Sequence, residues 1–340
     1  MKKKSILCTL AVVLALTGIT FTGCAGDRET LTLYGGMLED HVALAAREFE
    51  RETGIRTLFV RMSGGEIFAR IRAEAGNPQA SVWYGGGSLT FIEADRMGLL
   101  HRYISPNAAA IPAQFRCPNG AWTGIYTGYL GFGADRDWLE RNNVAMPTTW
   151  ECLLNPIFRG EIVMAHPGSS STAYNMLTTI LQLKGEDAGW DFMRRLNENI
   201  RQYTRSGSAG GRMVQLREVP LTIGYLHDII AFRREGFQHI VMAAPEDGTG
   251  FEIGAVGIIA NAPELEAAKR FVDWALTPAA QELGQRVNAL QFLTHPDARP
   301  PEEVRDLRVR LINQDDEWAG ANRTRFLEMF NEVARGRDPT

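Results

Sequence analysis

Three short segments combine glycines with hydroxyl side chains in one recurring context. They are YGGGS (84–88), GSSST (168–172) and YTRSGS (203–208), and each follows a predicted strand and precedes a predicted helix. In α/β proteins, ligands bind beyond the carboxyl ends of the strands, where the free backbone N–H groups of a helix start attract an anion. Glycines let the backbone approach such a ligand closely. The three segments therefore predict an anion site, for a phosphate or a carboxylate.

The donors at this predicted site would be backbone N–H groups, hydroxyls and one guanidinium. Arg205 would form charge-assisted hydrogen bonds to the anion, and the other candidates are Gly86, Gly87, Ser88, Ser170, Ser171, Thr172, Thr204 and Ser206. An alternative explains the same residues without a ligand, because Ser and Thr also cap helices and Gly also forms turns. The sequence contains neither a Walker loop nor a GxGxxG motif with a downstream acid.

A second set of polar residues follows or interrupts apolar strands. His227 and Asp228 come directly after LTIGYL (221–226), and Glu252 lies between glycines in GTGFEIG (248–254). Imidazole and carboxylate groups at a strand end can bind the hydroxyls of a sugar-like ligand. Alternatively, Asp228 caps the next helix, His227 is a core histidine and Glu252 is a solvated edge residue. Tyr126 and Thr127 belong to a glycine-punctuated strand that suits a hinge or a ligand-lining segment, and the tyrosine either stacks on a ligand or fills the core.

Motifs typical of catalysis or metal binding are absent from the sequence. No two of the six histidines have the helical spacing of metal ligands, and no HExxH, CxxC or GxSxG occurs. The net charge is −4, with acids and bases scattered, so no basic patch indicates nucleic acid. We therefore expect a protein that binds a small molecule and is not an enzyme, with no metal, no cofactor and no nucleic-acid partner. A secreted phosphate-ester hydrolase is an alternative, although no nucleophile–base or two-metal set is visible.

Strands and helices alternate along the first hundred residues. Strands are predicted at 30–36, 55–62 and 80–87, with helices at 41–51, 63–74 and 88–97. This order predicts a parallel sheet with crossover helices, and the chain alternates again further on. Even without its first 23 residues, the chain is long for one core. We predict an α/β fold of two lobes with a ligand cleft between them: residues 31–125 and 255–300 in lobe 1, 126–254 in lobe 2, and C-terminal helices at 301–340 packing on the lobes.

The N-terminus has the pattern of a secretory signal. Three lysines at positions 2–4 precede a mostly apolar run from 6 to 19. FTGC (21–24) then resembles a lipobox, which implies cleavage before Cys24 and lipidation of its thiol. Residues 1–23 would be a signal peptide and 24–30 a lipidated linker, whereas the alternative is an uncleaved N-terminal anchor.

The other cysteines give no further pattern. Cys8 lies within the predicted signal, which leaves Cys117 and Cys152. These two either form a disulfide, which requires an oxidising compartment, or stay free thiols.

Nearly the whole chain after the signal resembles the type 2 periplasmic binding proteins of ABC importers, the broad class that includes ferric-ion binders. Its first third carries the resemblance in TLTLYGG (30–36), FERETGI (49–55) and ASVWYGGGS (80–88). More narrowly, the chain resembles the binding proteins for hexose phosphates and phosphoglycerate. The residues that carry this likeness are GIYTGYLGFG (124–133), FRGEIVMAHPGSSSTAY (158–174), QYTRSGSA (202–209), HDII (227–230) and APEDGTGFEIG (244–254).

The resemblance implies two lobes that close on a ligand in their cleft. Hydroxyls and N–H groups of the helix starts would hold a phosphate, and His227, Asp228 and Glu252 would bind sugar hydroxyls. The implied partners are ABC permease and ATPase subunits, and the implied state is a monomer, lipid-anchored in the periplasm or on the outer face of the cell membrane. Two alternatives are a ferric-ion-binding protein, which typically uses adjacent tyrosines that this chain lacks, and a sensor subunit for a membrane kinase.

Overall fold

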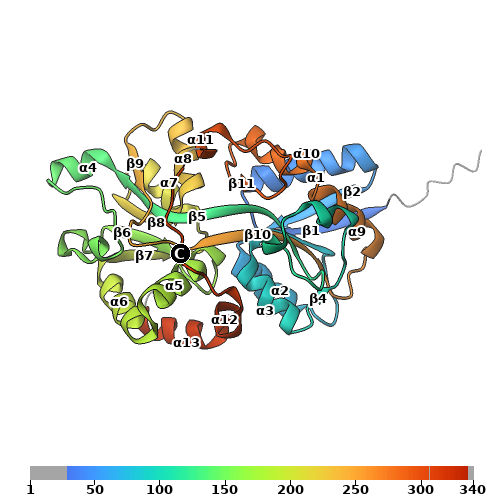
Figure 1. The fold of residues 1–340 in the computed structure, drawn as a ribbon, viewed down its shortest axis with the longest axis horizontal. Helices are drawn as coiled ribbons and strands as arrows, with labels where there is room; N and C mark the ends of the chain where they lie inside the picture. The colour runs from blue at the N-terminus through green and yellow to red at the C-terminus, as the bar shows by residue number, and fades with distance from the viewer. Residues whose placement is uncertain (1–28, 306, 336–340) are drawn as a thin grey trace, which may run out of the picture.

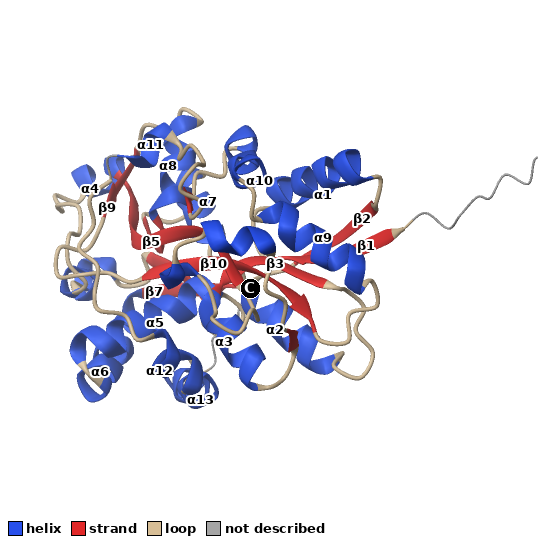
Figure 2. Cartoon of the chain, turned by 45° about the vertical axis from the view of Figure 1, so that its right-hand side comes forward, coloured by secondary structure: helices blue, strands red, loops and turns tan. Residues whose placement is uncertain are grey.

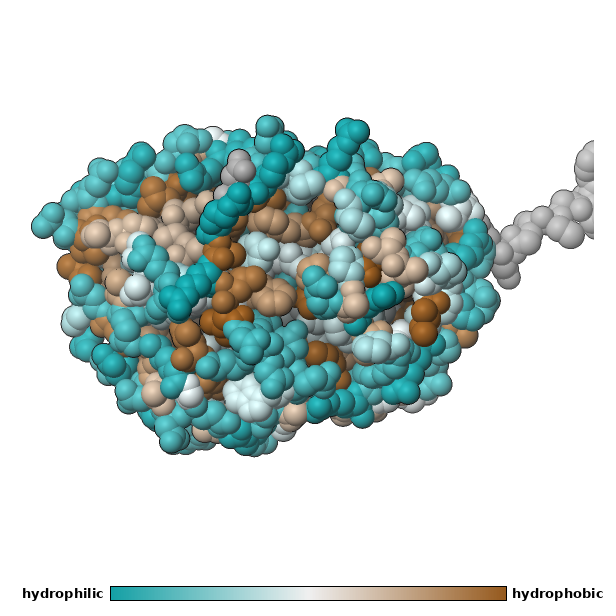
Figure 3. All heavy atoms as spheres, viewed as in Figure 1, coloured by the Kyte–Doolittle hydropathy of each residue, from teal (hydrophilic) through white to brown (hydrophobic). Residues whose placement is uncertain are grey.

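The computed structural model describes residues 29–305 and 307–335. The predicted signal segment and Cys24 lie outside the described residues. Figure 1 shows two halves that are joined by two long strands, β5 (Thr123–Asp135) and β10 (Phe251–Ile259). Hydrophilic side chains cover most of the face seen in Figure 3, with smaller hydrophobic areas between them. None of the described helices is long and apolar enough to cross a membrane.

One half of the molecule, called lobe 1 here, is built on parallel strands. Strand β1 pairs in parallel with its two neighbours, and β10 runs antiparallel to β3. The first three helices each connect consecutive strands, as the sequence predicts. The elements are β1 (Thr30–Gly35), α1 (Glu39–Thr53), β2 (Arg56–Arg61), α2 (Gly64–Ala73), β3 (Val82–Gly87), α3 (Ser88–Arg96), β4 (Leu100–His101), α9 (Leu265–Ala275) and α10 (Pro278–Glu282).

The other half, called lobe 2 here, has a second parallel set. Strand β6 pairs in parallel with β7 and β8, whereas β5 runs antiparallel to β8 and β9. The elements are α4 (Arg136–Arg141), β6 (Ile162–Ala165), α5 (Ser171–Lys184), α6 (Glu186–Asn199), β7 (Ile200–Thr204), α7 (Ala209–Gln215), β8 (Leu221–Tyr225), α8 (Leu226–Arg234) and β9 (Ile240–Ala243). In both lobes the helices cover the sheet (Figure 2).

Local sequence explains why these helices begin and end where they do. The apolar residues Val42, Ala45 and Phe49 recur at helical spacing and form the buried face of α1. Gly54 ends that helix with φ 76°, a left-handed conformation that favours glycine. Helix α5 begins at Ser170, whose side chain accepts a hydrogen bond from the N–H of Ala173.

Strand β5 belongs to both lobes. Its first part pairs with β10 and with β11 (Phe292–Leu293), and its last part pairs with β8 and β9. The continuous strand order is therefore β2-β1-β3-β10-β5-β8-β6-β7. Because β5 and β10 both run between the lobes, they are the natural hinge strands. We keep 31–125 with 255–300, and 126–254, as proposed lobe boundaries.

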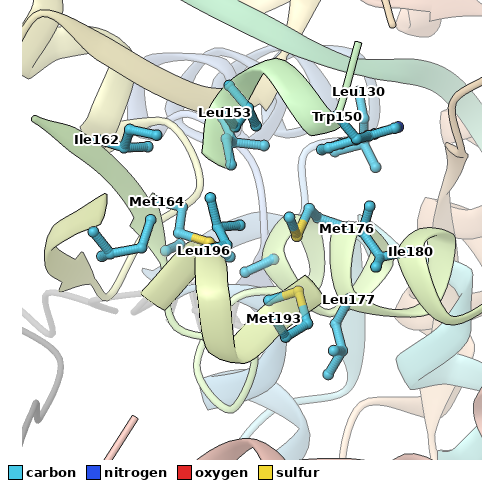
Figure 4. Packing of buried hydrophobic residues seen from close by; sticks show 14 of the residues in the cluster. Leu130, Trp150, Leu153, Ile162, Met164, Met176, Leu177, Ile180, Met193 and Leu196 are labelled. Atoms are coloured by element: carbon cyan, nitrogen blue, oxygen red, sulfur yellow. The ribbon is translucent and has the colours of Figure 1, made fainter. Parts of the chain in front are cut away.

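The core of lobe 2 lies between its sheet and the helices α5 and α6. Figure 4 shows Met176, Leu177 and Ile180 of α5 facing residues of β6 and α6. Trp150 is fully buried beside them, and its indole N–H donates to the carbonyl of Gly248 at 2.8 Å. That bond satisfies the one polar atom of a large apolar side chain.

The C-terminal helices contact both lobes. They are α11 (Glu302–Arg305), α12 (Asp316–Ala321) and α13 (Arg323–Val333), and residues 307–315 before α12 are not helical. Helix α12 packs on α3 of lobe 1, and the hydroxyl of Tyr174 in lobe 2 donates to the carbonyl of Ala319. At the start of α13, the buried guanidinium of Arg323 lies 3.4 Å from the carboxylate of Glu93.

The structure answers two questions that the sequence raised, about the segment 146–156 and about the two cysteines Cys117 and Cys152. The segment MPTTWECLLNP (146–156), whose sequence predicts a short helix capped by Thr148 or Thr149, contains only a 3-10 turn, Glu151–Leu154. The hydroxyl of Thr149 accepts a hydrogen bond from the N–H of Cys152 at 3.4 Å. The sequence left open whether Cys117 and Cys152 form a disulfide or stay free thiols. In the structure both thiols are free. The described part of the chain has four more 3-10 helices: Pro106–Ala110, Ala113–Phe115, Pro156–Phe158 and Leu283–Val287.

Candidate functional site

A cavity lies between the two lobes, where the carboxyl ends of their parallel strands meet. It encloses about 450 Å³ of atom-free space, including its open mouth. Lobe 1, lobe 2 and the hinge strands all contribute to its wall. The lining residues are Gly36, Met37, Leu38, Arg61, Ser63, Gly64, Tyr126, Ser170, Ser171, Thr172, Ser206, Gly207, Ser208, Tyr225, His227, Asp228, Glu252 and Gln291.

Two helix starts from opposite lobes face this cavity. Helix α2 begins after Ser63, whose backbone N–H donates to the carboxylate of Glu66 at 3.1 Å. Helix α5 begins after Ser170, so that Ser171 and Thr172 present the first N–H groups and two hydroxyls. The positive ends of the two helix dipoles therefore converge, which favours an anionic group between them.

Arg61, the last residue of β2, is the one Lys or Arg among the lining residues. Its Nε donates to the carbonyl of Met37 at 3.0 Å, and a terminal nitrogen donates to Ser206 Oγ at 3.2 Å, across the cleft. These bonds fix the guanidinium at the cavity wall. Arginine so held offers directed donors for a phosphate or carboxylate.

The opposite part of the cavity is acidic and aromatic. Glu252 on β10 is 7 % exposed, and the hydroxyls of Tyr225 and Tyr126 hydrogen-bond its carboxyl. Burial raises the pKa of Glu252 to about 8 despite these bonds, so the carboxyl is mainly protonated at neutral pH. Asn175 on α5 in turn donates to the Tyr225 hydroxyl at 3.2 Å, which orients the tyrosine.

His227 and Asp228 open helix α8 at the edge of the cavity. The imidazole Nε2 lies 3.6 Å from the Asp228 carboxylate, and the ring stacks on Tyr225 with centroids 5.4 Å apart. Burial lowers the pKa of His227 and raises the pKa of Asp228. The imidazole sits against Gly128 of β5, where a Cβ atom would meet its Cε1 at 2.5 Å. Glycine is therefore required there if the histidine is to reach the cavity wall.

Several alternatives left open by the sequence are decided here. Asp228 does not cap α8, because the residue before that helix is Tyr225 and no side chain caps it. Ser170 is an N-cap, and it also lines the cavity. Glu252 is a buried cleft residue and is not at a solvated edge.

The cavity brings together eight of the predicted site residues and leaves six outside its lining. The eight are Tyr126, Ser170, Ser171, Thr172, Ser206, His227, Asp228 and Glu252. The six are Gly86, Gly87, Ser88, Thr127, Thr204 and Arg205, and each of them has a structural place elsewhere.

The N–H of Gly86 donates to the Tyr126 hydroxyl, and the N–H of Gly87 donates to Ser171 Oγ, both at 3.2 Å. Ser88 is buried in the first turn of α3, and Thr127 pairs with β10 and β11. The hydroxyl of Thr204 donates to the carbonyl of Ser206 at 2.9 Å. These groups bond within the protein and do not line the cavity.

Arg205, the predicted cation of the site, points outward. Its side chain is 67 % exposed and its nearest charged partner is Glu66, 3.8 Å away. Arg61 takes the place at the cavity that the sequence assigned to Arg205. One signal could have found it: Arg61 ends a parallel strand two residues before Ser63 and Gly64, the same strand–glycine–helix design as in the three chosen segments.

The fold and the cleft define a two-lobed type 2 periplasmic binding protein. The chain matches the family model for bacterial extracellular solute-binding proteins over residues 91–315, and it belongs to that family. It is a periplasmic solute-binding protein of an ABC importer, as the resemblance predicted, and this family and its relatives are binding proteins.

Several known proteins are similar to this chain over most of its length. An uncharacterized protein of Haemophilus influenzae is 34% identical over 332 residues, which are 96% of each chain. A probable ABC transporter periplasmic-binding protein, y4fP of Sinorhizobium fredii, is 25% identical over 85% of this chain and 82% of its own. Among solved structures, the periplasmic binding protein AfuA from Actinobacillus pleuropneumoniae, with exogenous fructose-6-phosphate bound, has a TM-score of 0.87 and 36% identity over 90% of this chain and 98% of its own.

Proposed function

We propose that the cleft binds a small phosphorylated sugar or a similar organophosphate, which the protein delivers to a membrane permease and its ATPase. One observation carries the proposal: the same cavity joins an anion-binding end, made of Arg61 and two helix starts, to a hydroxyl-binding end with buried carboxyls. A ligand that has both a phosphate and hydroxyl groups would match both ends.

The anion-binding end suits a phosphate. The N–H of Gly64 at the start of α2, the first N–H groups of α5 and the hydroxyls of Ser171 and Thr172 supply neutral donors, and Arg61 supplies charge. Hydrogen bonds from charged donors contribute about 1.5–3 kcal/mol each, more than neutral ones. We therefore expect the phosphate to supply most of the affinity.

The other end suits a polyol. Hydroxyls both donate and accept hydrogen bonds, so they match a protonated carboxyl, a neutral imidazole and tyrosine hydroxyls. Glu252, His227 and Tyr225 are such groups, and burial keeps the first two neutral. The likeness to AfuA, which is 36% identical and holds fructose-6-phosphate, supports the same assignment.

Calorimetric titration with matched compounds tests the proposal. We expect heat with fructose 6-phosphate, weaker binding of inorganic phosphate and none of free fructose. Arg61→Gln should weaken fructose 6-phosphate binding by about 10-fold to 100-fold, since it removes a charged hydrogen-bond donor. Arg47→Gln, an exposed arginine on α1 away from the cavity, is the matched control.

Binding of ferric citrate alone, or of none of the phosphate compounds, would contradict this ligand assignment. Equal affinities of the Arg61→Gln and wild-type proteins would contradict the place given to the phosphate. Among the described residues no group of three or more His, Cys, Asp and Glu side chains could hold a metal ion.

We further propose that the protein is a lipoprotein tethered through Cys24, with residues 1–23 removed as a signal peptide. The lysines, the apolar run and the FTGC motif support this. Cys24→Ala should abolish labelling by a radioactive fatty acid and release the protein from the membrane fraction. Membrane attachment of a processed Cys24→Ala chain would contradict the anchor.

A further inference from the structure

Some groups that the sequence assigned to the ligand contact the opposite lobe in the structure. The N–H of Gly87, at the end of β3 in lobe 1, donates to Ser171 Oγ at the start of α5 in lobe 2. The guanidinium of Arg205, which follows β7 in lobe 2, lies 3.8 Å from the carboxylate of Glu66 in α2 of lobe 1. Both contacts cross the cleft.

A backbone hydrogen bond crosses the cleft at the same place. The N–H of Gly65, in the first turn of α2, donates to the carbonyl of Ser169 at 3.1 Å. The hydroxyl of Ser169 in turn donates to the carbonyl of Arg205 at 3.0 Å, so the loop before α5 and the loop after β7 form one surface. We call Gly65, Glu66, Ser169 and Arg205 the closure contact.

The closure contact leaves no room for a side chain at two glycines. A Cβ atom at Gly65 would meet the carbonyl oxygen of Gly168 at 2.5 Å and the carbonyl carbon of Ser169 at 2.8 Å. A Cβ atom at Gly64 would meet Ser171 Oγ at 2.9 Å. The atoms that Gly65 faces belong to the backbone, which cannot move aside cheaply. The backbones of the two lobes are therefore in direct contact here.

Opening of the cleft has to break these contacts. The lobes are joined by the hinge strands β5 and β10, whereas the closure contact joins them through α2 and the loops around α5 and β7. A hinge rotation keeps the strands intact and separates surfaces that merely touch. The closure contact is thus present in the closed arrangement and absent from an open one.

We propose that the residues of the closure contact set the affinity for every ligand by the same factor and do not select among ligands. These contacts stabilise the closed state of the protein relative to the open state. A ligand's apparent dissociation constant is its intrinsic value divided by the closed fraction, so a weaker closed state raises all dissociation constants equally. Arg205 is accordingly a positioning residue. The inference rests on the proposed function only for its choice of test ligands.

The first test uses full-length protein in detergent and titration calorimetry with fructose 6-phosphate, glucose 6-phosphate and inorganic phosphate. Gly65→Ala should raise all three dissociation constants by at least about tenfold and by a common factor. Gly76→Ala is the matched control, since a Cβ atom at Gly76 meets nothing within 4 Å. Arg205→Gln should raise the three constants by a common factor of about two to five, as expected for an exposed ion pair.

Glu66→Gln completes a double-mutant cycle with Arg205→Gln. Glutamine can replace glutamate in the capping box of α2, so the helix start is kept. We expect the double variant to bind no more weakly than either single variant. Factors that differ among the three ligands, additive effects in the cycle, or wild-type affinity of Gly65→Ala would each overturn the proposal.

A second test needs no ligand, so that failure of the proposed function stays distinguishable. Glu66→Cys with Arg205→Cys, in a chain with Cys117→Ser and Cys152→Ser, is treated with a short bismaleimide in membranes. We expect an intramolecular cross-link, read as faster migration on a denaturing gel, that the same chain without the two new cysteines does not form. Absence of the cross-link would overturn the closure contact whether or not any phosphate compound binds.

Discussion

Glu252 offers a prediction whose magnitude follows from its burial. Its carboxyl is 7 % exposed, and burial raises its pKa from the ordinary value of 4.5 to about 8. The folded protein therefore keeps this proton over a pH range in which the unfolded chain has already lost it. The free energy of unfolding should fall through that range as the pH rises.

The slope from this one group reaches about 1.4 kcal/mol per pH unit and falls off near each of the two pKa values, which amounts to about 3.5 kcal/mol between pH 5 and pH 8. Below the ordinary pKa of a glutamate the two states bind the same proton and the group costs nothing. Glu252→Gln has no proton to lose, and its amide can still pair with the hydroxyls of Tyr225 and Tyr126. The variant should therefore gain stability over the wild type as the pH rises.

Urea unfolding of the unliganded proteins at pH 5, 6, 7 and 8 measures this difference. Asp228, whose pKa burial also raises, and His227, whose pKa burial lowers, are present in both proteins. Their contributions largely cancel in the comparison. Parallel stability profiles for the two proteins would refute the reasoning, and so would a difference that grows towards acid pH.

Three further changes test other parts of the structure. Asp228→Asn should weaken fructose 6-phosphate binding by about tenfold and leave inorganic phosphate unchanged in calorimetry, because a carboxylate–hydroxyl bond contributes about 1.5 kcal/mol or more; equal losses for both compounds would contradict this place for the hydroxyls. Ser170→Ala removes the N-cap of α5 and should cost about 1 kcal/mol in urea unfolding, and an unchanged midpoint would show that the cap contributes nothing. Phe326→Ala empties a fully buried site in the core of lobe 2 and should cost about 3–5 kcal/mol in the same assay; a loss under 1 kcal/mol would mean that α13 is only loosely packed.

The fold could be predicted from the sequence because its elements are marked locally. Glycines punctuate the ends of β3, β6 and α1, and apolar residues repeat at strand or helix spacing between them. Local sequence was a poorer guide for residues 146–156, where a short helix is predicted but only four residues form a 3-10 turn around Cys152. Trp150 there is held by Gly248, about a hundred residues away in the chain, which no local pattern can indicate.

The site could be predicted only in part, because strand ends show where a cleft lies but not which side chains turn into it. Arg205 and Ser206 are neighbours in one loop, yet Ser206 lines the cavity and Arg205 faces solvent and Glu66. Arg61 was not among the predicted site residues, yet it lies at the cavity. Its hydrogen bonds to Met37 and Ser206 turn its side chain towards the cavity. The orientations of Arg61 and Arg205 both depend on contacts between the two lobes. Residue spacing along the chain does not indicate which side chains make those contacts.

A crystal structure of the protein grown with fructose 6-phosphate tests the central claim most directly. The account predicts the phosphate within hydrogen-bond distance of Arg61 and of the first N–H groups of α5, with the sugar hydroxyls against Glu252 and Asp228. A ligand bound in the reverse orientation, or a cleft that stays empty at saturating ligand, would contradict the account.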